Sequence, residues 1–119
     1  MKIAVTSKGP DLNADVDPRF GRAAYILVID TDTLAYEVID NAENVNAFKG
    51  AGIQAASMVS DNGAGVLLTG YCGPNAFKTL EAAGIKVAGD VSGTVMDAVN
   101  AFKDQKLSFT SAANVEGHW

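Results

Sequence analysis

Residues 66–88 carry the sequence VLLTGYCGPNAFKTLEAAGIKVA, in which two short apolar runs flank a stretch with helical spacing. Pro74 stands just inside the expected helix start and Gly84 just past its end, where these residue types are enriched. A strand, a helix and a second strand in this order favour a parallel pair with a right-handed crossover. The stretch therefore predicts an α/β fold.

Similar signals predict the remaining elements. We expect five strands, at residues 2–6, 25–30, 35–39, 66–69 and 86–88, and three helices, at residues 49–60, 74–83 and 95–102. The second and third strands are joined by a short turn and should be antiparallel, whereas the later strands alternate with helices and should be parallel. The prediction is one mixed sheet in the order 3-2-1-4-5, with helices on both faces.

Length and composition are those of one globular domain. The chain has 119 residues, of which 48% are hydrophobic and 19% charged, and this excludes a disordered chain. We expect a single domain over residues 1–119, with a core of about 1–105 and a tail of 106–119 in which residues 107–110 could pair as an extra edge. The net charge of −5 argues against nucleic acid and anionic membranes as partners.

The sequence also bears on where the protein acts. No apolar segment approaches the ~20 residues that a membrane helix needs. The N-terminus lacks the long apolar stretch of a signal peptide. The single cysteine, Cys72, allows no intrachain disulfide. We therefore expect a cytoplasmic protein.

Several loops that follow strands should meet at one edge of the sheet. In sheets of this kind, ligands bind outside the carboxyl ends of the parallel strands. Residues 7–22, 71–74 and 90–94 are expected there, and the helix start at 50–52 is a fourth candidate. Helix starts with glycine present N–H groups and a positive dipole end to an anion. The alternative is that each glycine only permits a tight turn.

Arg19-Phe20-Gly21-Arg22 contains both arginines of the chain. The guanidinium is a permanently charged, weakly hydrated fork of donors, which suits large soft anions. Phe20 would supply an apolar wall between the two charges. The alternative is that the arginines pair with Asp15 and Asp17 on a solvated loop.

Cys72 lies between an expected strand and an expected helix start. A helix N-terminus lowers a thiol pKa, and a thiolate is a good ligand for soft metals. Against this, free cysteine is often a small core residue, and one thiol does not complete a zinc or iron–sulfur site. The sole histidine, His118, and the adjacent Trp119 lie at the chain end and add no clear site.

Four stretches resemble the dinitrogenase iron-molybdenum cofactor biosynthesis family, of the NifX and NifB C-terminal type. They are MKIAVTS (1–7), DPRFGRAAYILVID (17–30), GAGIQAA (50–56) and LLTGYCGPNAFKTLEAAGIKV (67–87), and the resemblance spans residues 1–105. It implies a ribonuclease H-like three-layer fold. It also implies a carrier, not an enzyme, that binds iron–molybdenum cofactor or its precursors.

As a stand-alone domain of this length, the chain also resembles proteins that carry a molybdenum–copper sulfide cluster, which they hold without covalent protein ligands. On this resemblance Arg19 and Arg22 would neutralise the cluster, and Phe20, Tyr71 and Val91 would shield it. Backbone N–H groups near Gly73 and Thr94 would bind its sulfides. The expected site comprises Arg19, Phe20, Gly21, Arg22, Tyr71, Cys72, Gly73, Pro74, Val91, Ser92, Gly93 and Thr94, with Cys72 as the candidate direct metal ligand.

Two other functions compete with this one. The chain could be a binding module for a non-metal anion or for a protein partner, with no metal, whereas a carrier would have other cluster-assembly or acceptor proteins as partners. It could also be a divalent-metal phosphodiesterase of the ribonuclease H type. The first strand carries Ala4 and Val5 where such enzymes need a central carboxylate, which disfavours this last function.

Overall fold

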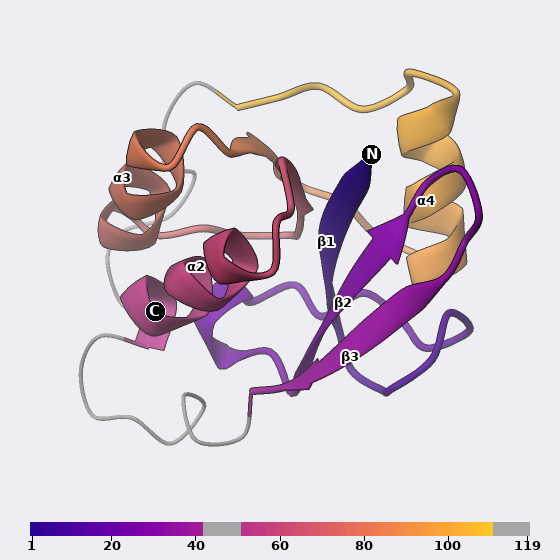
Figure 1. Cartoon of the computed structure of the whole chain (residues 1–119), viewed down its shortest axis with the longest axis horizontal. Coiled ribbons are helices and arrows are strands. Elements are labelled where there is room, and N and C mark those ends of the chain that lie inside the picture. Colours follow the sequence, from indigo (N-terminus) through magenta and orange to yellow (C-terminus); the bar gives the residue numbers. More distant parts are fainter. Residues whose placement is uncertain (42–50, 111–119) are drawn as a thin grey trace.

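The computed structural model describes residues 1–41 and 51–110 (Figure 1). Its five strands are β1 (Lys2–Ser7), β2 (Tyr25–Asp30), β3 (Tyr36–Asp40), β4 (Val66–Leu68) and β5 (Lys86–Ala88). They form one sheet in the order β3-β2-β1-β4-β5. The β1–β2 and β2–β3 pairs are antiparallel, and the β1–β4 and β4–β5 pairs are parallel. The predicted mixed sheet and its strand order are confirmed.

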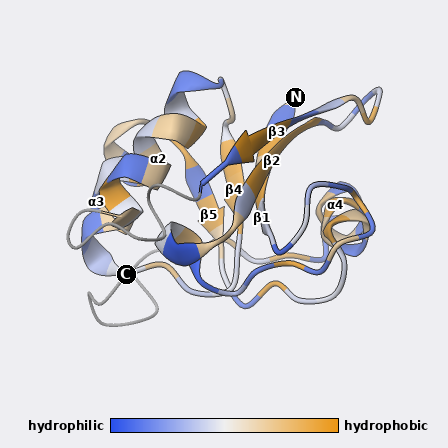
Figure 2. Ribbon diagram, turned by 90° about the horizontal axis from the view of Figure 1, so that it is seen from below, coloured by the Kyte–Doolittle hydropathy of each residue, from blue (hydrophilic) through white to orange (hydrophobic). Residues whose placement is uncertain are grey.

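Helices cover both faces of this sheet. They are α2 (Ala51–Asp61), α3 (Pro74–Ala82) and α4 (Val95–Lys103). Figure 2 shows α2 and α3 on one side of the strands and α4 on the other. Residues 49–50, the first two of the helix predicted over residues 49–60, lie outside the described residues. A short 3-10 helix, η1 (Phe20–Arg22), was not predicted. The ribonuclease H-like assignment and the single-domain division stay predictions.

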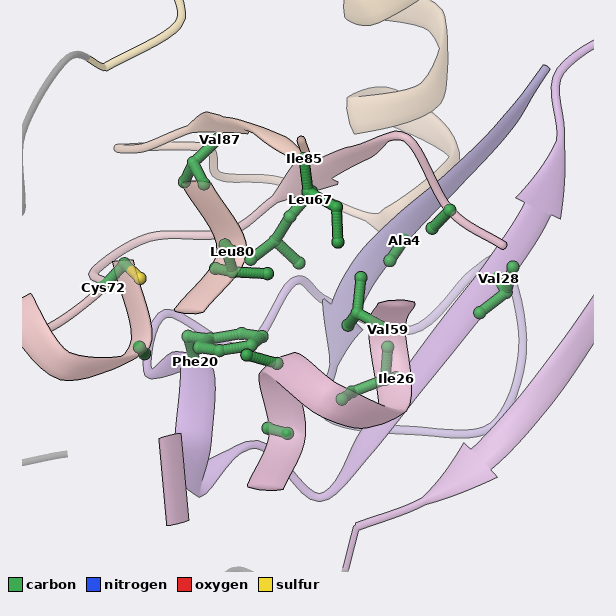
Figure 3. Close-up of a cluster of buried hydrophobic side chains, with 14 residues drawn as sticks. Ala4, Phe20, Ile26, Val28, Val59, Leu67, Cys72, Leu80, Ile85 and Val87 are labelled. Atoms are coloured by element: carbon green, nitrogen blue, oxygen red, sulfur yellow. The ribbon is translucent and has the colours of Figure 1, made fainter. Parts of the chain in front are cut away.

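The core has two halves, one on each face of the sheet. Side chains alternate along β1 and β2, so that Ile3 and Val5 pack under α4 while Ala4 packs toward α2 and α3. Both faces of these strands are buried, which explains why the sequence YILVID is apolar almost throughout rather than alternating. The half-core beneath α2 and α3, drawn in Figure 3, includes Phe20 and Cys72.

The described part of the tail adds a short contact to the β5 edge. Phe109 forms an isolated antiparallel bridge with Ala88, and the Thr110 N–H donates to the Val87 carbonyl at 2.8 Å. Residues 107–110 therefore pair at the edge, as a bridge rather than a full strand. His118 and Trp119 lie outside the described residues. Within residues 1–41 and 51–110, the helices are too short or too polar to cross a membrane.

Candidate functional site

Backbone hydrogen bonds tie the loop after β1 to the loop after β4. The Tyr71 N–H donates to the Pro18 carbonyl at 2.6 Å, and the Phe20 N–H donates to the Tyr71 carbonyl at 3.1 Å. Arg19 and Tyr71 thereby form a parallel bridge. Two predicted site residues that are far apart in the sequence are thus neighbours.

The loop after β5 joins the same edge. The Val91 N–H donates to the Thr69 carbonyl at 3.0 Å, and the Val16 N–H donates to the Gly93 carbonyl at 2.8 Å. Residues 15–22, 69–74 and 90–94 therefore form one connected surface, called here the three-loop edge. The structure brings together the three segments that the sequence analysis placed at the carboxyl ends of the parallel strands.

Two glycines make this close approach possible. A Cβ at Gly70 would lie 2.6 Å from the Cα and the carbonyl oxygen of Pro18. A Cβ at Gly21 would lie 2.7 Å from the backbone nitrogen of Gly52, at the start of α2. The α2 start therefore abuts the three-loop edge, although Gly50, part of the predicted glycine motif, is outside the described residues.

The two arginines differ in their surroundings. The Arg19 side chain is 51% exposed, and its Nε lies 3.7 Å from Oδ1 of the buried Asp17. The pairing with Asp17 that the sequence left open is therefore present, yet it leaves half of the Arg19 side chain in solvent. Arg22, at the end of η1, is partly buried. Asp15, the other acidic residue considered as a partner of the arginines, is exposed, and its backbone forms a bridge with Thr94.

The expected apolar shield is largely absent from the surface. Phe20 is 1% exposed and belongs to the core, where Figure 3 shows its ring beside Leu80. The interpretation of Phe20 as a wall against the ligand is therefore wrong, because its ring has almost no surface to offer. Val91 is also buried. Tyr71, at 41% exposure, is the one of these three side chains that reaches the surface.

The backbone N–H groups at the start of α4 already have hydrogen-bond acceptors. Thr94 and Asp97 form a capping box, in which the Thr94 N–H donates to Asp97 Oδ2 at 3.1 Å. The next two N–H groups, of Val95 and Met96, donate to backbone carbonyls of the β1 loop. That N–H groups near Thr94 bind sulfides stays a prediction, although those of Thr94, Val95 and Met96 already have other partners. Ser92 and Gly93 remain exposed beside Thr94.

The α3 start, in contrast, retains its donors. Gly73 is the N-cap residue, has no side-chain cap, and is followed by Pro74, which has no N–H. Within the described parts of the chain, the N–H groups of Gly73, Asn75 and Ala76 have no hydrogen-bond partner. The missing Ser, Thr, Asp or Asn at the N-cap position is the sequence signal that identifies these donors.

Cys72 is a core residue rather than a reactive thiol. It is 1% exposed, and burial raises the pKa of its thiol to about 12. Desolvation thus outweighs the expected lowering of the pKa by the helix start. The thiol is protonated at neutral pH and lies 3.7 Å from the Gly73 carbonyl, which argues against Cys72 as a direct metal ligand.

The described residues contain no conventional metal-binding cluster. No group of three or more His, Cys, Asp or Glu side chains within residues 1–41 and 51–110 is placed to hold a metal ion. What this edge offers instead is a half-exposed guanidinium, an exposed tyrosine, and N–H groups at the α3 start that have no partner among the described residues. These groups suit an anion held by charge and hydrogen bonds.

Fold and site together define a small α/β ligand-binding domain. The chain belongs to the dinitrogenase iron-molybdenum cofactor family, whose model matches residues 1–105. The resemblance seen in the sequence is thereby confirmed, and the family indicates a role in cofactor-related binding. No curated protein matches the chain.

Solved structures place the chain near particular members. It is similar to the apo form of the orange protein from Desulfovibrio gigas, with 50% identity, a TM-score of 0.93 and 96% of each chain covered. It is also similar to a NifB-like protein from Thermotoga, with 34% identity, a TM-score of 0.83 and 98% of each chain covered. A dinitrogenase-type protein from Methanocaldococcus jannaschii, at 17% identity and a TM-score of 0.68 over 94% of this chain and 96% of that one, shares the fold.

Proposed function

We propose that this protein binds an anionic, molybdenum-containing metal–sulfur cluster without covalent bonds and carries or stores it. The cargo is a molybdenum–copper sulfide cluster or a precursor of iron–molybdenum cofactor. The observation that carries the proposal is the Arg19–Tyr71 backbone bridge, which brings the backbone of Arg19 to within two residues of the uncapped α3 start in the chain. Family membership supports it.

The chemistry of the donors fits such a cargo. Metal-bound sulfide is a large, soft, charged acceptor, and the weakly hydrated guanidinium of Arg19 is a suitable counter-ion for it. Of the N–H groups at the positive end of the α3 dipole, that of Asn75 belongs to an exposed residue and would donate to a sulfide, whereas Gly73 and Ala76 are buried residues. Tyr71 would cover one side of the cluster, and Arg22 would add a second positive charge.

The buried thiol of Cys72 is consistent with non-covalent binding. A ligating cysteine must be a thiolate, and the raised pKa and burial of Cys72 oppose that form. Cluster and protein can then separate without breaking a metal–protein bond. This is what a carrier needs if it delivers its cargo to assembly or acceptor proteins in the cytoplasm, and it requires no catalytic residue.

Anaerobic loading tests this function. Apo-protein is titrated with tetrathiomolybdate, with and without Cu(I), and uptake is followed by visible absorbance and by elemental analysis after gel filtration. We expect coloured protein with a defined metal content. Protein that emerges without molybdenum under all these conditions would contradict the proposal.

Arginine variants locate the site. Each charge-assisted hydrogen bond contributes about 1.5–3 kcal/mol, so Arg19→Ala should weaken binding about tenfold or more, and Arg19→Ala/Arg22→Ala further. The control is Lys103→Ala/Lys106→Ala, which removes two exposed positive charges at the other end of α4. Equal affinities of the arginine and lysine double variants would place the ligand elsewhere. Circular dichroism checks that each variant is folded.

A further inference from the structure

Asp17 is a buried carboxylate at the three-loop edge. Its side chain is 6% exposed, and among residues 1–41 and 51–110 the cation within ion-pair distance is Arg19. Oδ1 accepts the backbone N–H of Arg19 at 3.1 Å and lies 3.7 Å from its Nε. Burying a carboxylate costs free energy unless it is paired, so we examine what this one contributes at the three-loop edge.

The backbone of Asp17 is fixed to the sheet. Its N–H donates to the Thr6 carbonyl at 2.9 Å, and its carbonyl accepts the Thr6 hydroxyl at 2.6 Å. The Thr6 hydroxyl is in turn 2.8 Å from that of Thr69, and both threonines are fully buried. The backbone of Asp17 is therefore anchored to β1 through Thr6, whereas the Arg19 side chain is half exposed.

We propose that Asp17 is a positioning residue that holds the guanidinium of Arg19 by its Nε side. The terminal nitrogens of the guanidinium then remain for an anionic ligand. The use of this arrangement for a metal–sulfur cluster rests on the function proposed above. The Asp17–Arg19 geometry itself does not.

The charge of Asp17 and its proposed positioning role predict opposite changes in anion affinity when Asp17 is replaced. Removing a negative charge beside an anion site should tighten anion binding if Asp17 contributes only its charge. Releasing a long side chain that must be ordered again on binding should weaken it, by about twofold to tenfold. Asp17→Asn keeps an oxygen that can accept the backbone N–H of Arg19 and removes the charge that attracts the guanidinium. The sign of the change in affinity therefore shows which of the two effects is larger.

The binding test is a double-mutant cycle with tetrathiomolybdate as the probe. Affinities are measured for the wild type, Asp17→Asn, Arg19→Ala and the double variant. We expect Asp17→Asn to weaken binding about twofold to tenfold in the wild type and not to weaken it in the Arg19→Ala background. Tighter binding by Asp17→Asn, or equal weakening in both backgrounds, would overturn the proposal.

Asp15→Asn is the matched control. Asp15 lies in the same loop and carries the same charge, but its side chain is exposed and bonds no arginine among the described residues. We expect this variant to bind tetrathiomolybdate as tightly as the wild type or slightly more tightly. Weakening equal to that of Asp17→Asn would mean that any charge lost from the loop has this effect.

A second measurement needs no ligand. In the apo-protein, the ion pair should shift the NMR signal of the Arg19 Nε–H away from that of a free arginine. This shifted signal should be lost in Asp17→Asn and kept in Asp15→Asn. An unaltered Arg19 Nε–H signal in Asp17→Asn would refute the positioning role even if the cluster binds. If the wild type takes up no tetrathiomolybdate but this signal is lost, the cluster function fails and the positioning of Arg19 stands.

Discussion

The burial of Phe20 between the two arginines makes a sharp prediction about stability. Phe20 is 1% exposed in the half-core beneath α2 and α3, among side chains that include Val59, Leu67 and Leu80. Truncation to alanine removes most of the ring and leaves a cavity that these neighbours fill only in part. We expect Phe20→Ala to lose about 3–5 kcal/mol of unfolding free energy.

This loss is large for a domain of this size. Total stabilities are about 5–15 kcal/mol, so Phe20→Ala should stand near the margin of folding. With a urea dependence of about 2 kcal/mol per molar, the midpoint of unfolding should fall by about 2 M. Phe20→Leu keeps most of the buried volume and should shift the midpoint by much less.

The assay combines urea unfolding, followed by circular dichroism, with tetrathiomolybdate titration of the folded variants. Phe20→Leu should bind within about twofold of the wild type, because the ring does not reach the surface. If the Phe20 ring instead formed an exposed wall of the ligand site, Phe20→Ala would lose little stability and Phe20→Leu would lose affinity for tetrathiomolybdate. If Phe20→Ala unfolds at the wild-type urea concentration while Phe20→Leu binds much more weakly, the reasoning from burial is refuted.

Three further predictions follow from other positions. Gly70→Ala should cost about 1–3 kcal/mol in urea unfolding, because its Cβ would meet the Pro18 backbone, and an unchanged midpoint would contradict this contact. Thr94→Ala should cost about 1 kcal/mol through loss of the α4 capping box and leave tetrathiomolybdate affinity unchanged, since its N–H already has a partner. Burial raises the pKa of Cys72 from 9.0 to about 12, so above pH 9 the unfolded chain holds fewer protons than the folded one. Stability should therefore fall between pH 9 and about 12, and equal pH profiles for the wild type and Cys72→Ala would exclude that cause.

Much of the fold could be predicted because its signals are local. Apolar runs give β1, β2 and β4, and the Pro74 start and a glycine stop give α3. The strand order follows from short turns and helical crossovers. The convergence of three loops follows from the same topology, since the carboxyl ends of parallel strands meet at one edge.

The details of the site depend on contacts that the sequence does not display. Phe20 begins the short 3-10 helix η1, in a stretch of sequence without periodicity, so nothing local shows that its ring turns into the core. The α4 start loses its donors to the carbonyls of Leu12 and Ala14, more than eighty residues away in the sequence. For Cys72, a helix start and burial shift the pKa in opposite directions, and only the structure decides which effect is larger.

The backbone bonds that join the loops after β1, β4 and β5 have a kinetic consequence. They involve main-chain atoms, so the backbone of this surface is ordered when the chain folds, and under the proposed function the cargo would not have to order it. Loading should then be limited by encounter and by loss of water rather than by rearrangement of the protein. Under the proposed function, release would likewise require no unfolding, and an acceptor would compete with the protein for the sulfides of the cluster.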